Sequence, residues 1–134
     1  MLPRTIFLSR LLGLYSLVIG LAMVAHRQAT LETIRAMMHN GPAMYLSGVI
    51  ALAAGLAMVL GHNVWRGGVL PVVVTLVGWL SLIKGVSILF LSAQFEEGTF
   101  LGGYIEHRFY LNATIAIIVG AYLTYAGFRA KAAT

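Results

Sequence analysis

Long apolar stretches separated by short polar segments dominate this chain. Four of them approach or exceed the roughly 20 residues that an α-helix needs to cross the hydrocarbon core of a bilayer. They lie at about 6–25, 43–60, 70–90 and 109–128. Because only short segments join them, the pattern predicts an all-α membrane protein with four transmembrane helices in a bundle. Residues 1–134 then form a single integral membrane domain.

Small side chains recur along all four stretches at spacings of three and then four residues. Lipid gives helices no hydrophobic reason to associate, so small residues that let backbones approach closely drive the packing. A three-then-four spacing places such residues on one narrow face of a helix. The predicted helix-packing residues are Gly13, Ser16 and Gly20; Gly48, Ala51 and Gly55; Gly78, Ser81 and Gly85; and Ala113, Ala116 and Gly120.

The two halves of the chain resemble each other at an offset of 65 residues. The segment LLGLYSLVIG at 11–20 aligns with LVGWLSLIKG at 76–85 without a gap. Each half holds two spans, and an even number makes the halves parallel, related by an axis along the membrane normal. We interpret residues 1–65 and 66–130 as two duplicated helical hairpins packed as a four-helix bundle.

Segment 26–42 predicts a short helix rather than coil. Apolar residues fall at spacings of three and four from Leu31 to Met38, and Thr30 is placed to cap the helix. Asn40 and Gly41 end it, and Pro42 suits the first turn of the second span. We expect a short interfacial helix on the outer leaflet, with a partner-binding helix as the alternative.

The other two connections differ in their expected regularity. Segment 61–69 is short, with His62 and Asn63 placed to stabilise the last carbonyls of the preceding helix. Its Trp-Arg pair is typical of an interfacial anchor. Segment 91–108 contains three glycines, which favour sharp turns, and we expect it to be irregular.

Composition and charge support a membrane location and predict an orientation. The sequence is 60% hydrophobic and 10% charged, whereas soluble domains have about 25% charged residues. Basic residues favour the cytoplasmic side, so both termini and segment 61–69 are expected there. The net charge of +5 is therefore a topology signal and not a nucleic-acid site. Basic residues on that side are Arg4, Arg10, Arg66, Arg129 and Lys131, and the acids on the other are Glu32, Glu96, Glu97 and Glu106.

The beginning of the chain, basic and then apolar, also has the form of a signal peptide. No small-x-small cleavage site precedes His26, so we expect a retained first helix. The sequence contains no cysteine, which excludes disulfides, thiolate metal ligands and cysteine nucleophiles.

Two stretches resemble a known group of proteins. The segments GHNVW at 61–65 and VVVTLVGWLSLIKG at 72–85 resemble segments of small four-span bacterial integral membrane proteins without an assigned function. The resemblance is best over His62–Gly85 and extends to the four-span layout. It implies a multi-pass protein of the bacterial inner (cytoplasmic) membrane, and it implies no catalytic or binding residue.

Lys84 lies well inside an apolar stretch, about 10 Å below its outer end. A lysine side chain can reach toward the interface, although a charge at this depth still costs free energy. Lys84 flanks Ser81 on the packing face, and its counterpart in the other half is Ile19. Two interpretations stay open: a structural ion pair or snorkelling, and a role in ligand binding or transport. The candidate partners are Glu32, Glu97 and Glu106.

Other chemistry is sparse. Three histidines, His26, His39 and His107, share the outer side with the acids, and imidazole with carboxylate can bind a divalent ion. No two of them lie four residues apart on one helix, so we expect no metal site. The sequence has no aspartate and no glycine-rich phosphate loop. We therefore expect neither an enzyme nor a cofactor.

Three functions remain. The first is a non-enzymatic accessory protein or subunit that associates with itself or with a larger membrane complex, since the helix faces are smooth and the loops minimal. The second is an oligomeric small transporter or channel for an anionic or lipid-like substrate near Lys84. The third is a binder of a hydrophobic ligand, such as a quinone or lipid, near Lys84 and Trp79.

Overall fold

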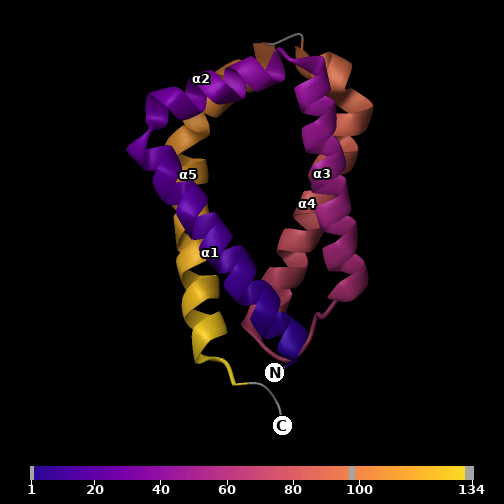
Figure 1. Ribbon diagram of the computed structural model, residues 1–134, viewed down its shortest axis with the longest axis vertical. Helices are drawn as coiled ribbons and strands as arrows, with labels where there is room; N and C mark the ends of the chain where they lie inside the picture. Colours follow the sequence, from indigo (N-terminus) through magenta and orange to yellow (C-terminus); the bar gives the residue numbers. More distant parts are fainter. Residues whose placement is uncertain (1, 97–98, 132–134) are drawn as a thin grey trace.

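Five helices make up the computed structural model, which describes residues 2–96 and 99–131, with the backbone alone at 91–96 and 99–107. They are α1 (Pro3–Ala25), α2 (Arg27–Met38), α3 (Gly41–Gly61), α4 (Val69–Glu96) and α5 (Thr99–Arg129) (Figure 1). The stretches that are long and apolar enough to cross a membrane are Pro3–Ala25, Gly41–Gly61, Val69–Phe90 and Arg108–Arg129. The prediction of an all-α membrane protein with four spanning helices is thus confirmed.

The spanning helices associate as two close pairs (Figure 1). α1 packs along α5 and α3 packs along α4, whereas the contacts between the pairs are few and join α4 to α1 and α5. Each hairpin of the sequence therefore contributes one helix to each pair. Figure 1 shows the pairs converging near the N-terminus, while α2 lies across the opposite end.

A small apolar cluster joins the pairs where they converge, which we call the inner end. Leu70 and Val74 of α4 are buried together with Leu123 of α5, and Leu8 and Leu12 of α1 pack against this cluster. Val74 and Leu123 have no exposed surface at all. The shared core of the two pairs thus sits at one end of the molecule.

The short helix predicted between the first two spans is confirmed as α2. Its buried residues are Leu31 and Met38, and Met38 forms a cluster with Met44 of α3 and Ile88 of α4. The predicted cap is wrong, because the amide of Thr30 already donates to the carbonyl of His26 at 2.9 Å inside the helix. α2 therefore begins four residues earlier than the capping pattern predicts.

The predicted start of the second span is confirmed. The side chain of Asn40 accepts a hydrogen bond from the amide of Ala43 at 3.1 Å, and a proline occupies the first turn of α3. The first amides of a helix have no acceptor within the helix, and the side chain of Asn40 supplies one.

The expectation of an irregular segment at 91–108 is wrong for the backbone described. α4 continues to Glu96 and α5 begins at Thr99. No proline interrupts either helix here, and each of Gly102 and Gly103 costs only about 1 kcal/mol in a helix interior. This cost is smaller than the stabilisation that the chain gains by continuing both helices. Residues 97–98, including the third predicted turn glycine, lie outside the described residues.

Candidate functional site

The small residues of α1 and α5 lie where these two helices touch. A Cβ added to Gly13 would collide with the backbone of Leu123 and Thr124, and one added to Gly120 would lie 2.5 Å from the amide nitrogen of Leu17. Real Cβ atoms essentially never approach other atoms so closely. The absence of a side chain at these glycines therefore sets the separation of α1 and α5.

The second pair is built in the same way. A Cβ on Gly55 would collide with the backbone of Leu82, and one on Gly85 with the backbone of Leu52. Among the predicted packing residues the glycines and Ala113 are buried, and the others are half-buried; these others are Ser16, Ala51, Ser81 and Ala116. The Oγ of Ser81 donates to the carbonyl oxygen of Ala51 at 3.0 Å, so this serine also adds a hydrogen bond between α4 and α3.

The contacts within the two pairs correspond residue for residue. The nearest neighbours of Gly13 are Leu123 and Thr124. Gly78, which follows Gly13 by 65 residues, has Met58 as its nearest neighbour, followed by Val59. The two sets of neighbours are also separated by 65 positions. The same shift relates the contact Gly20–Ile117 to Gly85–Leu52, and the contact Gly55–Leu82 to Gly120–Leu17.

A buried polar network joins the pairs at the inner end. His62 follows α3 directly and is 3% exposed. Its Nε2 lies 2.8 Å from the hydroxyl oxygen of Thr5 in α1, and its Nδ1 lies 3.2 Å from the hydroxyl oxygen of Thr75 in α4. Thr5 and Thr75 are each 1% exposed. The imidazole thus hydrogen-bonds the α1–α5 pair to the α3–α4 pair.

The number of donors and acceptors around Thr75 indicates which groups donate in this network. The hydroxyl of Thr75 lies 2.9 Å from the carbonyl oxygens of both Val64 and Pro71, and it accepts from the amide of Val64 at 3.1 Å. Because carbonyls only accept, the single hydroxyl proton of Thr75 goes to one of them. His62 then donates from Nδ1 to Thr75 and accepts at Nε2 from the hydroxyl of Thr5.

The roles predicted for His62 and Asn63 are largely wrong. The backbone amide of His62 does donate to the carbonyl of Met58 at 2.6 Å, but its side chain turns into the buried network. The Oδ1 of Asn63 accepts from the indole nitrogen of Trp65 at 2.7 Å and from that of Trp79 at 3.4 Å. The segment after α3 thus folds into polar contacts around the inner end.

The predicted ligand or ion-pair candidates are not brought together by the described residues. The side chain of Lys84 is exposed and forms no ion pair there. Glu32 is also exposed, and its carboxylate accepts a hydrogen bond from the side chain of Gln28 at 3.2 Å. The side chains of the other two candidates, Glu97 and Glu106, lie outside the described residues.

The face of α4 that carries Lys84 is the one turned toward the other pair. Lys84 follows Leu70 of the inner cluster by 14 residues, which places it within about 40° of the same face and about 21 Å farther along. Ile19 follows Thr5 by the same number, and Thr5 contacts the other pair through His62. Lys84 and Ile19 are both exposed. The two helix faces that meet at the inner end are therefore exposed at Lys84 and Ile19, although Ile88, farther along the same face of α4, is buried against Met38 of α2.

The outer histidines are also kept apart. His26 precedes α2 and His39 follows it, so the whole helix separates them. Within the part of the chain that the structure describes, no group of three or more histidine or acidic side chains lies close enough to hold a metal ion. The side chain of His107 lies outside those residues.

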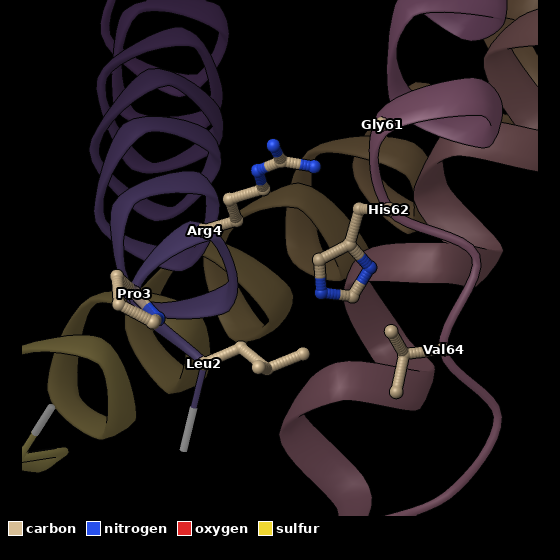
Figure 2. A pocket seen from close by; sticks show the side chains of 6 residues that line it. All are labelled: Leu2, Pro3, Arg4, Gly61, His62 and Val64. Atoms are coloured by element: carbon tan, nitrogen blue, oxygen red, sulfur yellow. The ribbon is translucent and has the colours of Figure 1, made fainter. Parts of the chain in front are cut away.

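A pocket of about 310 Å³ opens beside the buried network, between the start of α1 and the α3–α4 connection (Figure 2). Figure 2 shows the guanidinium of Arg4 extending from α1 toward Gly61 and His62. Arg4 is the one cationic side chain among the residues that line the pocket, and most of the others are apolar. Its lining residues are Leu2, Pro3, Arg4, Gly61, His62 and Val64.

Comparison with protein-family models, with curated proteins and with solved structures finds no match to this chain.

Proposed function

We propose that this protein is a non-enzymatic subunit of a larger membrane assembly, formed with further copies of itself or with another membrane protein. The observation that supports this proposal is the separation of the two helix pairs. Only 22% of the residues in the apolar 18-residue window of each spanning helix are buried within the protein, and the core shared by the pairs is confined to the inner end. Helices of a partner would supply the missing contacts.

Lys84 also indicates that a protein partner, rather than lipid, contacts the face of α4 that carries it. A lysine at the bilayer centre costs about 2.5–3.5 kcal/mol on insertion scales, and less near the end of a span. Lipid chains cannot lower this cost, whereas a carboxylate or carbonyl of a neighbouring helix can. Because Lys84 is exposed and has no ion-pair partner among the described residues, its compensating group comes from outside that part of the chain.

Native mass spectrometry of gently extracted protein tests the proposal. The chain has a mass of 14.4 kDa, so an assembly of copies gives multiples of this mass and a foreign subunit gives a different increment. We expect an assembly with wild-type protein and its partial loss after Lys84→Met. Monomers alone, from native membranes and without any bound polypeptide, would contradict the proposal.

A second candidate function is the binding or transport of an amphiphile with an anionic head group. Lys84 on the face between the pairs favours this alternative, because it is exposed and has no ion-pair partner among the described residues, and an acidic head group would neutralise it. The same spectra distinguish the two functions: a bound lipid or quinone adds a few hundred to about two thousand daltons, far less than a polypeptide. Flux of an anionic amphiphile into liposomes, abolished by Lys84→Met, would identify transport.

We also propose that the two halves are a duplicated hairpin and that both termini face the cytoplasm of a bacterial inner membrane. The correspondence of glycine contacts at an offset of 65 residues supports the duplication. Four arginines near the inner end, Arg4, Arg10, Arg66 and Arg129, support the orientation because basic residues favour the cytoplasmic side.

A further inference from the structure

We propose that the pocket at the inner end binds the phosphate group of an anionic phospholipid, with the guanidinium of Arg4 as its cationic contact. The site is separate from the face that carries Lys84 and does not depend on the oligomeric state. Three observations support it: the acids that the structure describes lie far from Arg4, the neighbouring arginines already make contacts, and the pocket walls are mostly apolar.

The charge distribution leaves Arg4 without an acidic partner among the described residues. The acids whose backbone the structure describes belong to the opposite end: Glu32 lies in α2, Glu96 ends α4 and Glu106 lies in the first part of α5. Arg4 lies in the first turn of α1, at the inner end. An arginine at a membrane surface is best compensated by a carboxylate or phosphate, which accepts two parallel hydrogen bonds from its guanidinium. We therefore expect the anion to come from outside the described part of the chain.

Two neighbouring arginines are already engaged. The Nε of Arg10 donates to the carbonyl of Gly127 at 2.9 Å, and its guanidinium lies 4.8 Å from the ring centre of Phe128. The guanidinium of Arg129 lies over the ring of Tyr125 at 5.3 Å. Arg4 has no such contact among the described residues, and its side chain extends along the pocket (Figure 2). It is thus the cation that remains for a ligand in this pocket.

The remaining walls of the pocket suit a phosphate attached to an apolar body. The two ring nitrogens of His62 are occupied by Thr5 and Thr75, so His62 has no ring nitrogen free to hydrogen-bond a ligand. Leu2 and Val64 present apolar side chains that can contact the glycerol and upper acyl carbons. α1 begins without a side-chain cap, and the positive end of its dipole lies beside Arg4.

Gly61 offers a way to close the pocket without disturbing the fold. It ends α3 and lines the pocket, and a Cβ built on it meets nothing within 4 Å. The variant Gly61→Leu therefore places an apolar side chain at the pocket wall without a backbone collision. Arg4→Gln removes the charge and keeps a side chain of similar reach. Arg66→Gln is the matched control, because Arg66 is exposed near the same surface and does not line the pocket.

The experiment is a titration of purified protein in neutral detergent with phosphatidylglycerol, followed by native mass spectrometry. We expect one phosphatidylglycerol to bind the wild type and the Arg66→Gln control with similar affinity. Binding should weaken about tenfold or more in Arg4→Gln and in Gly61→Leu. Thermal unfolding of each variant in the same detergent checks that it is folded.

The source of the phosphate is decided by competition. An excess of inorganic phosphate that displaces the lipid assigns the pocket to free phosphate or a soluble phosphate ester, and retention of the lipid assigns it to the phospholipid. Equal binding of phosphatidylglycerol by the wild type and Arg4→Gln would overturn the proposal. A loss in Arg66→Gln as large as in Arg4→Gln would overturn it as well, because binding would then follow net charge rather than the pocket.

Discussion

The hydroxyl oxygen of Thr5 and Nε2 of His62 lie 2.8 Å apart in a buried contact between the start of α1 and the residue after α3. The two residues are 57 positions apart in the sequence. This contact, together with the small apolar cluster beside it, holds two otherwise separate helix pairs together at one end.

Replacing Thr5 by valine should destabilise the protein. The substitution keeps the shape of the side chain but leaves Nε2 of buried His62 without a donor. An unsatisfied buried polar group costs about 1–3 kcal/mol. The free energy of unfolding, measured by titration of mixed micelles with a denaturing detergent, should fall by that amount. Thr114→Val is the control, since Thr114 is exposed on α5; equal stability of both variants would show that the contact is not structural.

The glycines between the helices should be sensitive to the smallest side chain. In Gly85→Ala the new methyl group would meet the backbone of Leu52, which forces α3 and α4 apart. Overpacking of this kind costs about 1–3 kcal/mol. Gly61→Ala is a matched control, because a Cβ there meets nothing within 4 Å. Unfolding in detergent should separate the two variants, and identical curves would contradict the close approach of α3 and α4.

Replacing Lys84 by methionine should leave the stability of the isolated chain unchanged or slightly raised. Lys84 is exposed and has no ion-pair partner among the described residues, so its removal breaks no contact there. Surface substitutions without such contacts change stability by about 0.5 kcal/mol or less. Thermal unfolding in detergent measures this. A clear loss of stability would instead support a structural ion pair, with Glu97 or Glu106 as the partner to test next.

The orientation can be tested with single cysteines, because the sequence has none of its own. Ala29 in α2 and Lys131 after α5 are both exposed. In intact bacterial cells a membrane-impermeant maleimide should label Ala29→Cys and should label Lys131→Cys only after the cells are broken. The reverse pattern would place the termini outside.

The sequence predicts the features that depend on local chemistry. The four spans follow from the length of the apolar stretches, and the start of α3 follows from Asn40 and a proline in its first turn. The sequence does not predict that α4 continues to Glu96 and that α5 begins at Thr99, because its glycines suggest turns, whereas in α5 the helix continues through Gly102 and Gly103 despite their cost.

The candidate site depends on distant residues and was accordingly harder to predict. His62 hydrogen-bonds Thr5, 57 residues away, and Thr75, 13 residues away, and no periodicity in the sequence relates the three. Hydroxyl residues at the ends of apolar stretches were the available signal. They become informative only when the packing of α1 against α5 and of α3 against α4 is known.

Site-specific photo-crosslinking in native membranes tests most directly whether a partner fills the face between the pairs. A photoreactive amino acid is introduced at Ile19, on that face, and at Leu21, about 200° around α1; the two residues are 44% and 54% exposed. The subunit proposal predicts that the probe at Ile19 links to a second polypeptide, whereas the probe at Leu21 gives lipid products. Products at Ile19 that contain only lipid, or only α4 of the same chain, would contradict it.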